Sequence, residues 1–71
     1  MTIEELKARA IQSMQEDLDT ASDAMDYGDD ELARKYRRRY FAKVDMYEAM
    51  FVGEYVYYLH DKVVVEGEVV D

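Results

Sequence analysis

The sequence contains no cysteine and only one histidine, so it lacks the side chains that stabilise many other small domains. Without cysteine there can be no disulfide framework, and a single histidine excludes a zinc site of the usual Cys/His kind. A chain of 71 residues buries only about 60% of the surface that it exposes when unfolded. We therefore expect its stability to come from close helix packing or from association with a second copy.

Proline is absent as well, whereas 49% of the residues are hydrophobic, which is far from the composition of a disordered chain. No run approaches the roughly 18 consecutive apolar residues that a membrane span needs. The N-terminus has neither the cationic start nor the apolar block of a secretory signal. We therefore expect a single domain over residues 1–71 in the cytoplasm, or in the host cytoplasm if a phage encodes it, with no membrane partner.

The N-terminal part of the sequence predicts a helix over residues 3–26. Thr2 and Glu5 match the capping box, in which the two residues satisfy free backbone N–H groups at the start of a helix. Apolar side chains then recur at intervals of three or four residues, which places them on one face. They are Ile3, Leu6, Ala10, Met14, Leu18, Ala21 and Met25. Gly28 can adopt the left-handed conformation that ends a helix, which predicts a short turn into an antiparallel neighbour.

A second helix is predicted over residues 30–52, with Asp29 or Asp30 as its N-cap. Its apolar side chains also recur every three or four positions. They are Leu32, Tyr36, Tyr40, Val44, Tyr47 and Phe51. With their flanking residues they cover close to half of the helix circumference, which is more than one neighbouring helix usually covers. Gly53 ends this pattern.

Residues 54–59 and 62–70 are rich in β-branched and aromatic side chains, which predicts two strands. His60 and Asp61 between them allow a two-residue hairpin turn. The alternative is that the second helix continues to about Leu59. We predict the β-hairpin, and with it a mainly α, α+β fold: an antiparallel helical hairpin followed by a C-terminal β-hairpin. Both faces of this β-hairpin are apolar. One face can cover the helices, and the other needs a second partner, so we predict a homodimer.

The net charge of −8 is distributed in three blocks along the chain. Residues 1–30 carry −7, residues 31–43 carry +5 and residues 44–71 carry −6. The field of the whole molecule disfavours nucleic acid as a direct partner, because both are negatively charged. It favours a basic protein as the partner.

The run RKYRRRY lies in the basic block, and its two tyrosines fall on the apolar face of the second helix. In an antiparallel hairpin we expect Arg34 to lie level with Asp23. Arg37 and Arg38 then lie level with Asp19 and Thr20. This arrangement predicts ion pairs between the helices, each of which contributes ~0.2–1 kcal/mol when it is exposed. The basic run would then balance the acidic charge of the first helix and favour this alignment of the two helices.

Acidic side chains on the outer face of the first helix suggest a function. Four carboxylates from Glu16 to Asp26 lie along about 15 Å of helix, or one per ~5 Å, which approaches the charge spacing of a DNA strand. We predict a small acidic protein-binding domain that inhibits or sequesters its partner, as a DNA mimic toward a basic nucleic-acid-binding host protein. The predicted partner surface consists of Glu4, Glu5, Glu16, Asp19, Asp23, Glu48 and Glu54. In size and charge the chain is similar to early bacteriophage proteins that disable host factors.

Aromatic side chains exceed what a two-helix core can cover, which predicts a surface for self-association. This surface consists of Phe41, Tyr55, Val56, Tyr57 and Tyr58. One alternative to the inhibitor is a structural homo-oligomeric adaptor. Another is a nucleic-acid binder that uses Arg37, Arg38 and Arg39. The acidic face can also serve solubility alone.

No group of residues in the sequence combines into a catalytic, cofactor or metal site. The segment DAMDYGDDE places Met25 and Tyr27 where an EF-hand calcium loop needs oxygen ligands. A catalytic His60 would need a substrate pocket and usually an orienting group, and a chain of this length has little room to form a pocket. Ser13 and Ser22 are distant from His60 in sequence. We therefore expect a non-enzymatic protein without a cofactor.

Overall fold

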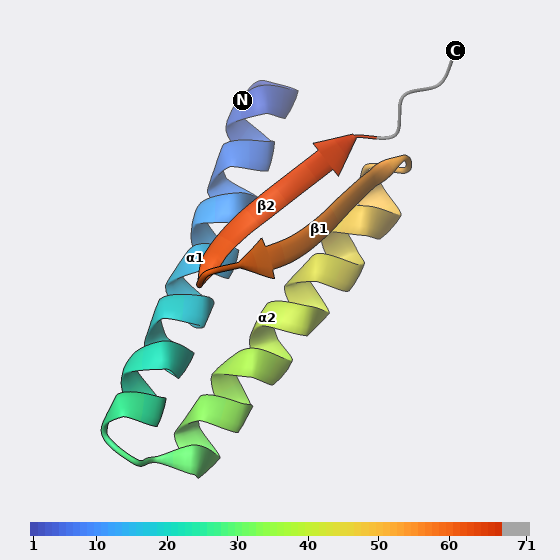
Figure 1. Cartoon of the computed structure of the whole chain (residues 1–71). Coiled ribbons are helices and arrows are strands. Elements are labelled where there is room, and N and C mark those ends of the chain that lie inside the picture. Colours follow the sequence, from blue (N-terminus) through green and yellow to red (C-terminus); the bar gives the residue numbers. More distant parts are fainter. Residues whose placement is uncertain (68–71) are drawn as a thin grey trace.

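Two helices followed by a two-stranded antiparallel sheet make up the fold (Figure 1). A computed structural model describes residues 1–67 of the chain. The elements are α1 (Ile3–Asp26), α2 (Asp30–Met50), β1 (Glu54–Leu59) and β2 (Lys62–Gly67). The mainly α, α+β fold predicted from the sequence is confirmed.

The element boundaries differ from the predicted ones in small ways. Helix α2 ends at Met50, two residues earlier than predicted, because Phe51 leaves the helical conformation with φ −117° and ψ 76°. The alternative in which this helix continues to about Leu59 is wrong, since residues 54–59 pair with β2 as a strand. Residues 68–70, the end of the predicted second strand, lie outside the described residues.

Both helices begin at the caps that the sequence predicts. Thr2 Oγ1 accepts a hydrogen bond from the backbone N–H of Glu5 at 3.1 Å. The Asp29 side chain accepts one from the N–H of Leu32, also at 3.1 Å. Between the helices Gly28 has φ 79°, in the left-handed region that only glycine enters without steric cost. The chain therefore reverses direction within a few residues, which makes α1 and α2 antiparallel neighbours.

The β-hairpin closes through His60 and Asp61, which have φ 51° and 59°. Two consecutive residues with positive φ form a turn whose twist matches that of the strands. Leu59 pairs with Lys62 across this turn, and the antiparallel register continues without a bulge to the far ends of both strands. The hairpin is thus regular even though neither turn residue is glycine.

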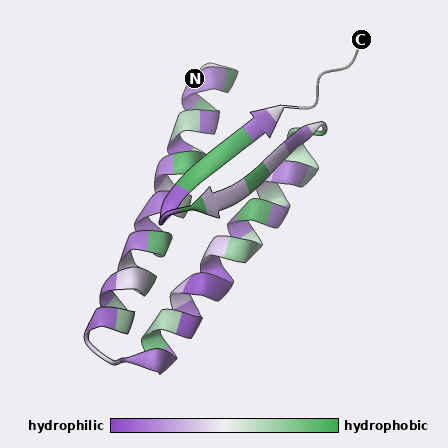
Figure 2. Ribbon diagram, in the orientation of Figure 1, coloured by the Kyte–Doolittle hydropathy of each residue, from purple (hydrophilic) through white to green (hydrophobic). Residues whose placement is uncertain are grey.

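The sheet lies across one face of the helix pair, with β1 against α2 and β2 against α1 (Figure 1). Hydrophobic residues are concentrated in β2 (Figure 2). The core between the helices and the sheet consists of Met14, Leu18, Tyr40, Val44, Tyr47 and Val56. Each helix therefore contacts both its neighbouring helix and one strand, which explains why the apolar face of α2 is wider than one neighbour requires.

Near the turn between the helices, small side chains replace large ones in the interface. Ala21, Ala24 and Ala33 are at most 4% exposed there. Met25 and Leu32, which the spacing assigns to the buried faces, are 46% and 37% exposed. Alanines allow the two helix backbones to approach closely. The larger neighbours are consequently displaced to the flanks of the interface.

Tyr40 gives a prediction about stability. It is 1% exposed, and its hydroxyl has no hydrogen-bond partner among residues 1–67. Burial raises the pKa of Tyr40, and Tyr58 and Glu48 raise it further. We expect Tyr40→Phe to leave the free energy of unfolding unchanged or to raise it by up to ~1 kcal/mol, because the variant removes a buried polar group that is not satisfied.

Urea denaturation measures this effect, and Tyr47→Phe is the matched control. The Tyr47 hydroxyl donates to Glu54 Oε1 at 2.9 Å, so its loss is expected to cost about 1 kcal/mol. A larger loss of stability in Tyr40→Phe than in Tyr47→Phe would contradict the account of this core.

Candidate protein-binding surface

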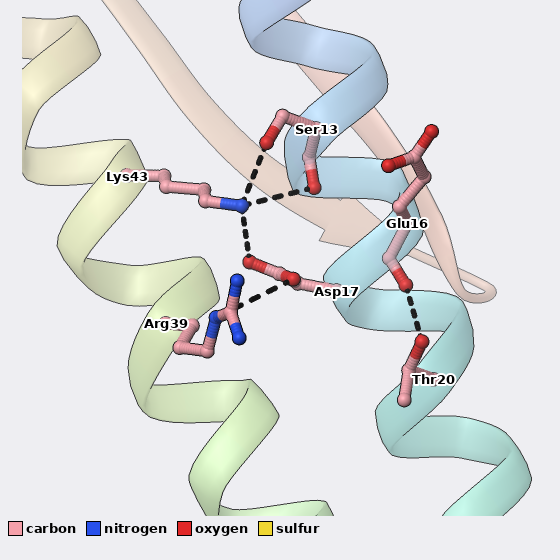
Figure 3. Close-up of polar contacts among 6 residues, drawn as sticks. All are labelled: Ser13, Glu16, Asp17, Thr20, Arg39 and Lys43. Carbon is pink, nitrogen blue, oxygen red and sulfur yellow. Dashed lines mark hydrogen bonds and ion pairs between the residues drawn. The ribbon is translucent and has the colours of Figure 1, made fainter.

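A row of exposed carboxylates runs along α1 on the side opposite the core. We call it the acidic ridge, and it consists of Glu16, Asp19, Asp23 and Asp26. Their spacing of three or four residues keeps them on one exposed helix face, although Asp26 also borders a hollow that Arg37 and Tyr58 line. Figure 3 shows Glu16 pointing away from α2. The ridge is thus open to an approaching macromolecule.

Two of the four ridge carboxylates accept hydrogen bonds from amide groups. Gln15 Nε2 donates to Asp19 Oδ1 at 2.9 Å, and Gln12 Nε2 lies 3.5 Å from Glu16 Oε1. Within residues 1–67, no lysine or arginine nitrogen lies within 4.0 Å of a ridge carboxylate. The negative charge of the ridge is therefore not neutralised by contacts within the described fold.

The predicted ion pairs of Arg34, Arg37 and Arg38 with the acids of α1 do not form within the described part of the chain. Asp19 and Asp23 project away from α2, so being level with an arginine does not bring them into contact with it. The acid that faces α2 is Asp17, which the periodicity left unassigned. The antiparallel register was predicted correctly, but the facing residue was not.

Asp17 joins the two helices through a partly buried polar cluster (Figure 3). It is 4% exposed, and its Oδ2 lies 2.6 Å from Lys43 Nζ. Arg39 Nε lies 3.8 Å from Asp17 Oδ1. Lys43 Nζ also donates to Ser13 Oγ at 2.6 Å, so one ammonium group binds two side chains of α1. This cluster holds the helices in register, which is a structural role.

Glu48 and Glu54, two members of the predicted partner surface, are used inside the molecule. Glu48 Oε2 accepts a hydrogen bond from the backbone N–H of Val56 at 2.8 Å and so ties α2 to β1. Glu54 forms an ion pair with Lys7 and accepts a hydrogen bond from the Tyr47 hydroxyl. The hydrogen bond from Lys7, followed by that from Tyr47, holds the pKa of Glu54 below its ordinary value. Both carboxylates are therefore occupied by contacts within the described fold and are less free to bind a partner.

Glu4 and Glu5 lie in the exposed first turn of α1. Glu5 takes part in the N-terminal cap, where its Oε1 lies 3.3 Å from Thr2 Oγ1. Both carboxylates face solvent at the end of α1 that is distant from the ridge. They can extend an acidic surface toward the N-terminus, and acids in the first helical turn also interact favourably with the helix dipole.

The aromatic residues predicted to self-associate are divided by the structure. Val56 is 8% exposed and belongs to the core, so it is unavailable for self-association, contrary to the prediction. The alternation of a strand explains this, because Val56 and Tyr58 point toward the helices. Tyr58 packs edge-to-face on Tyr40 with ring centroids 5.5 Å apart, and Phe41 does so at 5.2 Å. Both remain about half exposed at the flank of the core.

In the alternative hypothesis the chain binds nucleic acid through Arg37, Arg38 and Arg39, but these three side chains lie in different surroundings. Arg39 is directed to Asp17 and lies over the Tyr36 ring, 5.0 Å from its centroid. Arg37 lines a hollow beside the tip of the β-hairpin, together with Tyr58. Arg38 lines a different hollow beside an acidic side chain of the first turn of α2. A nucleic-acid strand would not meet all three arginines on one surface.

An apolar groove of about 170 Å³ lies between the helices. Leu6, Met46 and Met50 contribute to its lining, with Lys43 and Ser13 at one end. The Lys43 ammonium already binds Ser13 and Asp17. The groove therefore offers no free charged group to orient a ligand.

The described part of the chain has neither a candidate metal site nor a membrane-spanning helix. Among residues 1–67, no group of three or more histidine, cysteine, aspartate or glutamate side chains is placed to hold a metal ion. Neither α1 nor α2 is long and apolar enough to cross a membrane.

Comparisons of the chain with protein-family models, curated proteins and solved structures each found no match.

Proposed function

We propose that this chain is an acidic protein-binding domain that inhibits or sequesters a basic, nucleic-acid-binding protein by presenting the acidic ridge in place of DNA. The observation that supports this proposal is that no cation of the described fold neutralises the ridge. Its carboxylates are spaced at about 5 Å along the helix, compared with ~3.4 Å per charge along one DNA strand. A rigid helix keeps them aligned before the partner arrives, which lowers the ordering cost of binding.

The net charge of −8 supports the same kind of partner. A field of this sign steers a positively charged protein toward the chain and repels nucleic acid. The proposed setting is the cytoplasm, where such a domain would meet nucleic-acid-binding proteins. Four exposed ion pairs contribute only about 1–4 kcal/mol in total, so the ridge of one copy would bind weakly. We therefore include self-association in the proposal, because two copies would present two ridges to one partner.

The test replaces the ridge acids by their amides. The variant Glu16→Gln/Asp19→Asn/Asp23→Asn removes three charges and keeps the side-chain shapes. Both it and the wild type are immobilised and exposed to the proteins of a cell lysate that heparin retains. We expect the variant to bind about 3- to 100-fold more weakly, because three exposed ion pairs are lost. The captured proteins should also elute at lower salt.

The matched control removes three charges elsewhere on the surface, in Glu31→Gln/Asp45→Asn/Asp61→Asn. It has the same net charge as the ridge variant, so it measures the effect of the whole-molecule field. Thermal unfolding of both variants is expected to resemble that of the wild type, since no ridge acid is ion-paired in the described fold. Equal loss of binding in the two variants would refute a specific role for the ridge.

A further inference from the structure

The face of the sheet that points away from the helices has no covering within residues 1–67. We call it the outer face. Cross-strand partners share a face, so the outer face is made of three pairs: Tyr55 with Glu66, Tyr57 with Val64, and Leu59 with Lys62. Tyr55, Tyr57 and Leu59 are 55%, 39% and 56% exposed. An apolar middle thus lies between an acidic end and a basic end.

The edges of this sheet are partly closed to another strand. In a hairpin with a two-residue turn, the N–H groups of Val56 and Val63 point outward from the two edges. Glu48 Oε2 accepts from Val56 at 2.8 Å, and Gln15 Oε1 accepts from Val63 at 2.9 Å. A side chain of α2 therefore occupies one edge and a side chain of α1 the other. Strand addition would have to break these contacts, whereas packing on the outer face breaks none of them.

We propose that two copies of this chain pack their outer faces together about a two-fold axis that lies between the sheets and runs across the strands. This inference rests on the self-association included in the proposed function. Such an axis reverses the strand direction and places each strand over its own counterpart. Glu66 of one copy then faces Lys62 of the other, and this happens twice. Val64 and Tyr57 face their own equivalents, and Tyr55 faces Leu59.

The charges on the outer face favour this axis over one that runs along the strands. A two-fold axis along the strands would place β1 over β2, so that Glu66 faces Tyr55 and Lys62 faces Leu59. Both charged groups would then be covered without a partner of opposite sign, which is costly. With the axis across the strands each is paired. The Tyr57 hydroxyl donates a hydrogen bond to Glu66 Oε1 at 2.7 Å, and the second carboxylate oxygen remains for Lys62 of the other copy.

The area of the outer face limits the expected affinity of the dimer. A tyrosine side chain buries ~150–250 Å² when it is fully covered, so the exposed parts of Tyr55, Tyr57 and Leu59 together offer roughly 300 Å². A standard stable interface needs ~800 Å² from each partner. The dimer is therefore expected to be weak, with a Kd of about 10–1,000 µM.

The test exchanges the charges at the two ends of the outer face. Lys62→Glu makes both ends acidic, and Glu66→Lys makes both basic. Each variant alone is expected to dimerise at least tenfold more weakly than the wild type, because like charges then face each other. An equimolar mixture is expected to form a heterodimer of about wild-type strength, since every facing pair is again opposite. Sedimentation equilibrium over about 10 µM to 1 mM measures all three samples.

Matched controls change the net charge by the same amounts away from the outer face. Lys35→Glu and Asp45→Lys are expected to dimerise like the wild type, alone and mixed. A wild type that stays monomeric over the whole range overturns the proposal. Single charge variants that dimerise as strongly as the wild type overturn the axis and with it the proposal. The ridge amide variant is expected to keep the dimer, so failure of the ridge and failure of this interface are distinguishable.

Discussion

Lys43→Met is expected to lower the free energy of unfolding by about 3 kcal/mol. The variant leaves the buried Asp17 carboxylate with only Arg39, whose Nε is 3.8 Å away. Removing one member of a buried ion pair typically costs ~3–5 kcal/mol, and we expect the lower value because 30% of the Lys43 side chain is exposed. In a domain of this size the melting temperature should fall by roughly 12–24 °C.

Urea and thermal denaturation of three variants test this prediction. Lys35→Met removes an exposed lysine that has no ion pair in the described fold, and its stability is expected to stay within about 0.5 kcal/mol of the wild type. Asp17→Leu/Lys43→Met removes both charges and is expected to recover most of the loss, because no unpaired buried charge remains. If the single and double variants are equally unstable, the cost lies in packing and the account of the polar cluster is wrong.

Alkaline pH is expected to lower the free energy of unfolding between pH 10 and about 12, by up to about 3 kcal/mol, because Tyr47 ionises less readily in the folded chain than in the unfolded chain. Burial, followed by the hydrogen bond to Glu54, raises the pKa of Tyr47 from 10.0 to about 12. In this pH range the unfolded chain loses the tyrosine proton and the folded chain keeps it. The stability contribution is therefore fully present below pH 10 and is lost as the pH rises through about 12.

The pH dependence is measured by urea denaturation at about pH 9, 10 and 11. The pKa of Tyr40 is raised by burial and that of Tyr57 by its hydrogen bond to Glu66, so both act in the same direction. Tyr47→Phe should make the decline between pH 10 and 11 shallower, whereas Tyr55→Phe, which changes an exposed residue, should not. A wild-type stability that does not fall over this interval would contradict the buried, hydrogen-bonded state of Tyr47.

Much of the fold could be predicted because its signals are local. The capping residues Thr2 and Asp29 and the left-handed Gly28 fix the helix starts and the turn within a few residues of sequence. The β-branched and aromatic composition after residue 53 identified the strands in the same way. These features depend on neighbours along the chain and not on tertiary contacts.

The candidate site was harder to predict because charged side chains were expected on exposed helix faces, whatever their spacing. Asp17 follows Met14 by three positions and precedes Ala21 by four, so its spacing is that of a buried residue. An aspartate at such a position signals an inward ion pair, and Lys43 supplies it. Glu48 and Glu54 accept hydrogen bonds from residues seven or eight positions away across the junction of α2 and β1. Helical periodicity alone does not reveal contacts of that kind.

The sheet shows a second limit of sequence patterns. Both faces of β1 carry large apolar side chains, so alternation could not decide which one covers the helices. Val56 is buried and Tyr55 is exposed because the hairpin leaves α2 through the turn at Gly53, which sets the orientation of the strand. That orientation also places Lys62 and Glu66 on the outer face.

Competition with DNA is the measurement that tests the proposed role of the acidic ridge most directly. Basic nucleic-acid-binding proteins captured on the immobilised chain are challenged with increasing amounts of a duplex of about 20 base pairs, at low and at physiological salt. If the ridge occupies the DNA-binding surface of its partner, the duplex should compete with the ridge for that surface and release the captured protein at both salt concentrations. Captured protein that stays bound in the presence of excess duplex would contradict DNA mimicry.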